Sequence, residues 1–400
     1  MPRILQINAT ANWGSTGCIA EQINNLSREK GWDCYIAYGR YSNASQSTLI
    51  QVGSKLCVIS HYLENRIFDN EGLASRLATK RLIKEIQKLA PDIIHLHNIH
   101  DHWLNYELLF KYLNTTDIPV VWTLHDCWAF TGGCTHYSLN GCYKWQNGCV
   151  NCKHKRNLLD RSHKHYSLRK ELFLSNINLT VVSVCDWLKS ELKQSFMQSL
   201  NIITIYNGVD LDTFCERRNS QILSKYSLDG KYVLLALATT WSDKKGFNDY
   251  IQLSEQLPTD CILLMVGVTS EQKRHLPDNI IGIEMTQDVN ELMSLYSVSN
   301  IVLNLSYEES FGLTTIEGFA CGTPAIDYDT TACPEQISKE TGLVVKAGDI
   351  NGIVNAINFM RKSDSEAYSK ACRKRAEELY DINKSYARYI ELYESLLNNR

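Results

Sequence analysis

The sequence lacks a strong net charge, a long apolar run and a recognisable leader. Its 41 Lys and Arg residues nearly balance 44 Asp and Glu residues, so the chain as a whole is not drawn to nucleic acid or membranes. The longest apolar runs, such as CILLMVGV, are far too short to cross a bilayer and suit buried parallel strands. The first residues, MPRILQINAT, hold no apolar core and no small-residue cleavage site, so we expect no signal peptide.

The composition also excludes disorder and a small disulfide scaffold. With 44% hydrophobic and 21% charged residues, the 400 residues can bury two sizeable cores, and no repeat or low-complexity tract is visible. The 14 cysteines are spread over a large chain for which we expect no leader. We therefore expect a reducing cytoplasm, with most thiols acting as small apolar core residues.

Apolar strands alternate with amphipathic helices along most of the chain. In the first half, a helix over 74–90 stops at Pro91, and in the second half helices are expected over 247–257, 288–298 and 313–321. The expected strands are 4–8, 34–39, 93–97, 120–125, 179–184, 232–239, 261–268, 280–284, 301–306 and 323–328. This alternation predicts an α/β protein with doubly wound parallel sheets.

Two interruptions divide the pattern. A Cys-rich insertion over 127–152 and a basic helix over 153–175 break the first half, and the alternation restarts after IYNGVDLDTF. We expect domains over 1–204 and 205–380, then a last helix over 381–400 whose apolar stripe docks on another element. Because ligands of open α/β sheets bind beyond the carboxyl ends of strands, functional residues are sought in the loops that follow strands.

The densest motif is EESFGLTTIEGFACGTPA, at 308–325, directly after a strand. Gly312 opens a helix whose first backbone N–H groups suit a pyrophosphate. Glu317 on that helix can accept hydrogen bonds from two ribose hydroxyls, and Glu309 in the loop can hold sugar hydroxyls. The alternative for each residue alone is an ordinary capped helix with two solvated glutamates.

Three further loops follow strands of the first half. NWGSTG has Gly14 and Gly17, which let the backbone approach a ligand, but the absence of Gly-x-Gly-x-x-Gly counts against NAD. TLHD places His125 and Asp126 at a strand end. HLHNIHDHW brings further histidines to the neighbouring strand end. Strand alternation puts His95 and His97 on one face, without completing a hydrolase site.

These motifs resemble the retaining glycosyltransferases of family 4, which have the GT-B fold. The resemblance covers essentially the whole chain and is densest in ESFGLTTIEGFACGTP, with IYNGVD as a second landmark. LHNIHDHWLN, with TLHD, FTGGC and GC after it, resembles a subgroup that includes colanic-acid and capsule glycosyltransferases. The resemblance implies two Rossmann-like domains facing a central cleft, with a C-terminal helix that crosses back to the first domain.

The resemblance also implies roles for single residues. Glu309 would contact the donor sugar, Lys245 would grip the departing diphosphate, and His125 would lie near the transferred sugar. Relatives carry an Arg five residues before this Lys, where this chain has Thr240; Lys244 is a neighbour that can share the charge. The implied donor-binding set is Gly14, Ser15, Thr16, Gly17, Thr240, Lys244, Gly267, Ser310, Phe311, Gly312, Leu313, Thr314 and Glu317, with His97 and Asp126 on the acceptor side.

Four cysteines of the insertion are spaced for a metal. Cys134, Cys142, Cys149 and Cys152 lie within nineteen residues, and the last two form a C-x-x-C pair. They can wrap a tetrahedral structural zinc; two labile disulfides or free thiols are the alternatives. No cofactor is expected for catalysis itself.

The segment KHKRNLLDRSHKHYSLRK, at 153–170, has seven Lys or Arg residues against one Asp. The plain interpretation is a solvated helical face. Leu158, Leu159, Tyr166 and Leu168 interleave with the charges, however, and such a surface can rest on anionic lipid. Nucleic acid fits less well, because the patch is single and the chain slightly acidic.

The combined reading is retaining transfer of a sugar from a UDP- or GDP-sugar to a glycan or polyprenyl-linked acceptor, in bacterial surface polysaccharide synthesis. No side-chain nucleophile is needed, which agrees with the lack of a Ser-His-Asp or Cys-His arrangement. The alternatives are a GT-B sugar-nucleotide epimerase or hydrolase, and a sugar-nucleotide-binding protein that lost activity with the Arg.

Overall fold

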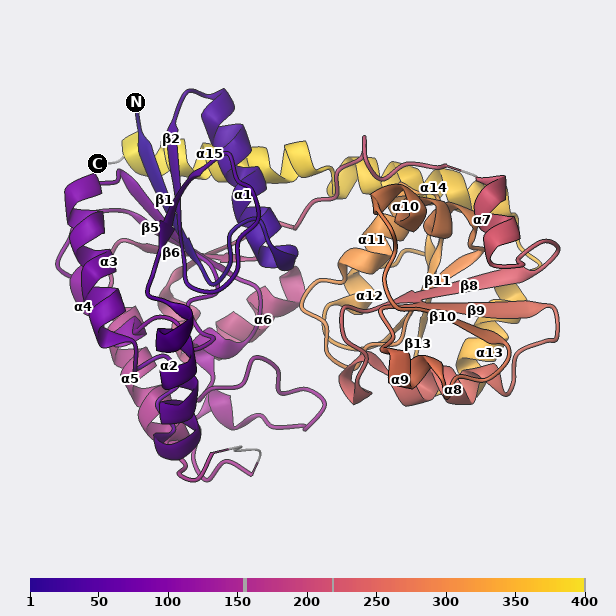
Figure 1. The fold of residues 1–400 in the computed structure, drawn as a ribbon, viewed down its shortest axis with the longest axis horizontal. Helices are drawn as coiled ribbons and strands as arrows, with labels where there is room; N and C mark the ends of the chain where they lie inside the picture. Colours follow the sequence, from indigo (N-terminus) through magenta and orange to yellow (C-terminus); the bar gives the residue numbers. More distant parts are fainter. Residues whose placement is uncertain (154–156, 218, 399–400) are drawn as a thin grey trace. The chain divides into compact units, whose positions relative to one another are not determined.

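The computed structural model describes residues 1–153, 157–217 and 219–398, which form two compact units (Figure 1). The first unit comprises residues 1–206 and the chain from Ser385 onward, and the second comprises Asn207–Lys384. The expected boundaries, after 204 and after 380, lie two and four residues before these divisions. No helix in the described ranges is both long and apolar enough to span a membrane.

The first unit is built on a parallel seven-stranded sheet in the order β3-β2-β1-β4-β5-β6-β7. Strands β4, β5 and β6 are buried along their whole length, as expected for a sheet covered on both faces. The order reverses between β1 and β4, and the carboxyl ends at such a switch point are where ligands bind. The strands are β1 (Arg3–Asn8), β2 (Asp33–Tyr38), β3 (Thr48–Gln51), β4 (Ile93–Leu96), β5 (Val120–Leu124), β6 (Leu179–Ser183) and β7 (Asn201–Thr204).

The first unit contains more helices than the sequence analysis expected, and the expected helix over 74–90 is among them. The helix over 76–89 ends at Ala90, which takes a left-handed conformation just before Pro91. The helices are α1 (Gly14–Glu29), α2 (Lys55–Phe68), α3 (Arg76–Leu89), α4 (Tyr106–Leu113), α5 (Ser162–Leu174) and α6 (Asp186–Gln194), with short 3-10 turns η1 (Trp128–Phe130), η2 (Lys144–Gln146) and η3 (Phe196–Ser199).

The last helix, α15 (Ile382–Asn398), packs on the sheet of the first unit, where Figure 1 draws it in yellow. Tyr386, Tyr389 and Tyr393 are almost fully buried. The Tyr393 hydroxyl lies 2.5 Å from Nδ1 of His95 on β4. The apolar stripe seen in the sequence is therefore core.

The second unit holds a parallel six-stranded sheet in the order β10-β9-β8-β11-β12-β13, which again reverses beside its first strand. The doubly wound fold class is confirmed for both units. The strands are β8 (Tyr232–Leu237), β9 (Cys261–Val266), β10 (Ile280–Ile283), β11 (Ile301–Asn304), β12 (Ala325–Tyr328) and β13 (Gly342–Val345). The helices are α7 (Ser220–Lys225), α8 (Phe247–Ser254), α9 (Ser270–Lys273), α10 (Val289–Val298), α11 (Leu313–Ala320), α12 (Cys333–Gln336), α13 (Ile350–Met360) and α14 (Ser365–Leu379), with a 3-10 turn η4 (Asp243–Lys245).

The expected basic helix over 153–175 is wrong at its start. Residues 154–156 lie outside the described residues, 157–161 is not helical, and α5 begins at Ser162. Arg169 on α5 is completely buried and donates hydrogen bonds to the carbonyls of Trp128 and Thr131. Arg169, part of the charge run, thus lies in the protein interior, where its guanidinium joins the insertion to α5.

Candidate active site

The loop after β1 leads into α1 without a capping side chain. The N-cap residue Trp13 gives no side-chain hydrogen bond, so the first-turn N–H groups, including those of Ser15 and Thr16, suit an anion. Gly14 takes a left-handed φ of 64°, and a side chain there would meet open space. At Gly17 a Cβ would lie 2.7 Å from Thr10 Oγ1, so packing within the loop already requires that glycine.

In the second unit, two ion pairs join the loop after β8 to the loop after β11. Lys245 Nζ lies 2.5 Å from Glu309 Oε2, and Lys244 Nζ lies 2.6 Å from Oε2 of Glu308, whose side chain is completely buried. The structure thus brings together Lys245 and Glu309, which are 64 residues apart.

Glycines allow these two loops to approach each other. Gly246 has a φ of 67°, and a Cβ there would lie 2.2 Å from the carbonyl oxygen of Leu305. Gly267 is also required by the backbone, since its Cβ would lie 1.7 Å from the Ala238 oxygen. We expected Gly267 to contact the donor, but the structure shows that packing already requires a glycine there. Thr240 lies exposed in the loop after β8.

Helix α11 begins at the end of the same loop with a free first turn. Its N-cap, Gly312, has a φ of 92° and contributes no side-chain cap, which leaves first-turn N–H groups such as that of Thr314 for an anion. The loop is held from outside: Glu309 N donates to Thr331 Oγ1 at 2.9 Å, and Gln336 Nε2 donates to the Phe311 carbonyl. Ser310 and Phe311 are buried in it.

Glu317 lies on α11 in surroundings that disfavour its charge. Burial raises the pKa of its carboxyl from 4.5 to about 7, although the hydrogen bond from the Tyr296 hydroxyl, at 2.7 Å, acts in the opposite direction. A carboxylate held this way, with one oxygen taken by a tyrosine, can accept from the hydroxyls of a polar ligand.

In the first unit, two histidines meet at the ends of β4 and β5. His97 Nδ1 lies 3.1 Å from His125 Nε2, and the rings stack at 16°. Burial lowers the pKa of His125 to about 4 and holds that of His97 well below its usual range, so both rings are neutral at pH 7. His125 keeps part of its surface exposed.

Asp126 forms a hydrogen bond with His100, a histidine that the sequence analysis did not name as a site residue. His100 Nε2 lies 2.9 Å from Asp126 Oδ2, and His100 Nδ1 lies 3.2 Å from Asp101 Oδ1. Burial alone would lower the pKa of His100, but these two carboxylates raise it well above its usual range. Asp126 Oδ1 also accepts from Trp128 N. Asp101 and His102 have φ values of 77° and 64°, in the left-handed region that non-glycine residues seldom adopt.

Comparison with known proteins agrees with this geometry. The model of glycosyltransferase family 4 matches residues 14–213, and the model of glycosyl transferases group 1 matches residues 220–379. The chain belongs to glycosyltransferase family 4.

Relatives and solved structures extend the match. A protein described as the colanic acid biosynthesis glycosyl transferase WcaC of Escherichia coli is 22% identical, over 88% of this chain and 89% of its own. Sucrose-phosphate synthase of Thermosynechococcus elongatus has a TM-score of 0.73 at 17% identity, covering 100% of both chains. Anabaena Alr3699/HepE in complex with UDP has a TM-score of 0.69 at 14% identity, covering 99% of this chain and 100% of its own. This family 4 enzyme therefore has the GT-B fold.

The insertion of this family 4 chain gathers its four cysteines without forming a ligand set. Burial raises the pKa of Cys134 to about 12, and the thiols of Cys152, Cys149 and Cys142 add to the effect. All 14 cysteines are free thiols, so the structure contains neither of the two disulfides considered for the insertion. Across the residues that the structure describes, no three His, Cys, Asp or Glu side chains are arranged to hold a metal.

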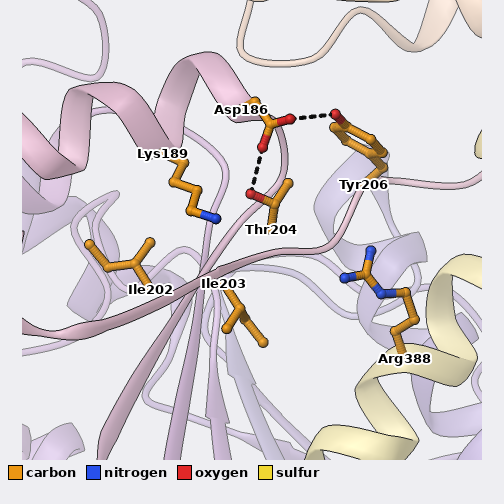
Figure 2. Close-up of a pocket in the computed structure, with 7 residues that line it drawn as sticks. All are labelled: Asp186, Lys189, Ile202, Ile203, Thr204, Tyr206 and Arg388. Carbon is orange, nitrogen blue, oxygen red and sulfur yellow. Dashed lines mark hydrogen bonds between the residues drawn. The ribbon is translucent and has the colours of Figure 1, made fainter.

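A pocket of about 390 Å³ lies elsewhere in the first unit, between α6, β7 and α15 (Figure 2). Asp186 accepts hydrogen bonds from Thr204 and Tyr206, both at 2.8 Å, and Lys189 and Arg388 line the rim. None of the expected site residues lines it. It was missed because β7 is a partly buried edge strand, NIIT, that the sequence analysis did not identify.

Proposed function

We propose that this family 4 glycosyltransferase moves a sugar, with retention, from a nucleotide-diphosphate sugar to a glycan acceptor in the synthesis of a bacterial surface polysaccharide. The observation that carries the proposal is the cluster in the second unit: the Lys245–Glu309 pair, the free first turn of α11 and Glu317. The name of the colanic acid relative supports a polysaccharide product.

The cluster supplies what a diphosphate leaving group requires. Backbone N–H groups from Ser310 to Thr314 would hold the diphosphate, and Lys245 would balance the charge that grows as the bond to the anomeric carbon breaks. The acceptor hydroxyl attacks that carbon from the same face, and its proton passes to the departing phosphate oxygen. Glu317 would hold the ribose and Glu309 the sugar.

The missing Arg leaves Lys245 as the main cation of this site. Lys244 is paired with a fully buried carboxylate, Glu308, and so holds the two loops together. We propose that Lys244 has a structural role, and that the N-terminus of α11 takes over part of the work of the Arg. The donor is a UDP- or GDP-sugar; solved structures of similar fold contain UDP and UDP-glucose.

We also propose a polyprenyl-linked acceptor at the cytoplasmic face of a membrane, because α2 exposes an apolar face. Leu56, Ile59, Leu63 and Ile67, three to four residues apart on this helix, are each about half exposed or more. Residues 157–161 of the basic segment pack at the end of α2, where Leu158 N donates to the Arg66 carbonyl. An apolar helix face with Lys55 and Arg66 on the same helix suits anionic lipid.

Vesicle binding tests this membrane contact. We expect the protein to bind phosphatidylcholine vesicles more strongly when they contain phosphatidylglycerol, and salt to weaken the binding. The double variant Ile59→Asp and Leu63→Asp should lose the binding, whereas Ile177→Asp, at a 92% exposed position away from α2, should keep it. Equal binding by both variants would contradict the proposal and leave the segment as an ordinary solvated surface.

Donor turnover tests the proposed reaction against its alternatives. Incubated with UDP-glucose or GDP-mannose alone, the enzyme should release almost no nucleotide, and release should begin when a polyprenyl-linked saccharide is added. Rapid turnover without acceptor would favour a hydrolase or epimerase. Donor binding without turnover on a broad acceptor panel would favour a binding protein.

A further inference from the structure

A chain of hydrogen bonds begins in the backbone of the first unit and ends at His125. Its first member is Asn24 on α1, whose Nδ2 donates to the Tyr35 carbonyl at 3.4 Å and to Ser47 Oγ at 3.0 Å. A backbone carbonyl can only accept, so this contact fixes which end of the Asn24 amide is NH2. Asn24 Oδ1 is therefore left to accept from the next member.

Gln6 on β1 is that next member, and its amide is fixed in the same way. Its Nε2 donates to the Ala20 carbonyl and to Asn24 Oδ1, both at 2.6 Å. Both protons of the amide are thereby used inside the protein. Gln6 Oε1 faces the other way and can only accept.

His97, directly after β4, meets that acceptor. Its Nε2 lies 2.6 Å from Gln6 Oε1 and must carry a proton to make this hydrogen bond. The ring is fully buried and neutral, since burial holds its pKa well below the usual range. A neutral imidazole has one N–H, so His97 Nδ1 carries a lone pair.

His125 closes the chain. Its Nε2 lies 3.1 Å from His97 Nδ1, and two lone pairs cannot face each other at this distance, so His125 Nε2 carries the proton. His125 is neutral as well, which leaves Nδ1 unprotonated. Within the described residues no hydrogen bond engages this Nδ1, and part of the side chain is exposed.

We propose that Asn24, Gln6 and His97 are positioning residues that fix the tautomer of His125, so that its Nδ1 accepts a hydrogen bond from a substrate hydroxyl. Only the identity of the ligand, a hydroxyl of the donor sugar, rests on the proposed function. Nδ1 of His125 can therefore accept a hydrogen bond from a sugar hydroxyl, but it cannot donate one to a phosphate oxygen. Hydrogen bonds in such a chain strengthen one another, which favours a single tautomer.

Nitrogen-15 NMR of histidine-labelled protein tests the tautomer directly and needs no substrate. The His125 signals are assigned by difference with His125→Gln. We expect Nε2 of His125 to show the shift of a protonated ring nitrogen and Nδ1 that of an unprotonated one, between about pH 6 and 8, because its pKa lies near 4. A neutral His125 with its proton on Nδ1 overturns the proposal.

Gln6→Met tests the chain at a residue that does not contact His125. Without its acceptor, His97 can move its proton to Nδ1, and His125 should then populate both tautomers. His97→Leu should have the same effect, whereas His97→Asn, whose amide oxygen can accept from His125 Nε2, should keep the wild-type signals. His275→Gln, at an exposed position in the second unit, is the matched control. An unchanged tautomer in both Gln6→Met and His97→Leu overturns the chain.

Adding a donor separates this proposal from the proposed function. With a nucleotide sugar that binds, the Nδ1 signal of His125 should move toward the hydrogen-bonded range. A fixed tautomer whose Nδ1 signal stays still in the presence of bound donor overturns the ligand assignment alone. A correct tautomer in a protein that binds no nucleotide sugar supports the positioning residues and contradicts the proposed function.

Discussion

The carboxyl group of Glu317 is held where burial works against its charge, and this has a consequence for stability. Its pKa in the folded protein, about 7, lies above the ordinary 4.5, so the folded state binds more protons than the unfolded state between these values. Stability should therefore fall as the pH rises through this window. Glu317→Gln keeps an acceptor for Tyr296 and removes the charge.

We expect Glu317→Gln to raise Tm at pH 8 and to change it little at pH 5. The gain at pH 8 should be on the order of 1–3 kcal/mol, since the side chain keeps partial exposure. Thermal unfolding at the two pH values checks this. A variant less stable than wild type at pH 8 would mean that the carboxylate is stabilised where it lies.

The two neighbouring lysines should differ in what their loss affects. Lys245→Ala should lower kcat about 100- to 1000-fold with a smaller change in KM, because the diphosphate charge grows in the transition state. Lys244→Ala should mainly lower Tm, since it leaves buried Glu308 without its ion-pair partner. Steady-state kinetics and melting curves, with Lys339→Ala as an exposed control, separate the two effects. Full turnover in Lys245→Ala with loss in Lys244→Ala would reverse the roles.

Sequence and structure agree unevenly at the level of residues. Glu309 and Lys245 stand in short motifs next to strand ends, so their meeting between two loops could be predicted. His100 and Gln6 could not, because their partners are set by strand order. Gln6 lies 91 residues from His97, and only the pairing of β1 with β4 brings them together.

At the level of elements, the cysteine-rich insertion carries a prediction about metal binding. We propose that its four thiols rearrange into a tetrahedral zinc site when the metal is present, because Cys142, Cys149 and Cys152 already lie close enough to Cys134 to raise its pKa. Protein purified under reducing conditions should contain about one equivalent of zinc, and chelation should lower Tm. Metal analysis of Cys149→Ser and Cys152→Ser, with Cys57→Ser outside the insertion as control, checks the ligands. Metal-free wild type with unchanged melting after chelation would leave them as free thiols.

The elements that could be predicted are those with a long apolar period. The strands and the buried stripe of α15 are visible in the sequence because tight packing restricts their residue types. Strands β3, β7 and β13 lie at the edges of their sheets and are only partly buried, so the sequence constrains them less. The start of α5 was placed too early because a run of Lys and Arg reads as a solvated helix, whereas Arg169 is bonded inside the fold.

At the scale of the whole molecule, two parallel sheets each offer loops at a switch point, and we propose that each unit carries part of the chemistry. The second unit holds the residues proposed for the nucleotide and diphosphate, and the first holds His125 with its positioning residues. The two family models match largely different units, at residues 14–213 and 220–379. Which sugar is moved depends on side chains that line the bound donor.

Calorimetric titration with UDP and with GDP tests the central claim most directly, because each is the product that remains when a sugar is transferred. The account predicts that one of the two binds the wild type with one site per chain. Glu317→Ala should weaken this binding about 10- to 150-fold, the loss of hydrogen bonds to a charged group, and Lys339→Ala should leave it unchanged. Absence of binding by both nucleotides, or equal affinity in wild type and Glu317→Ala, would contradict a nucleotide-sugar site on α11.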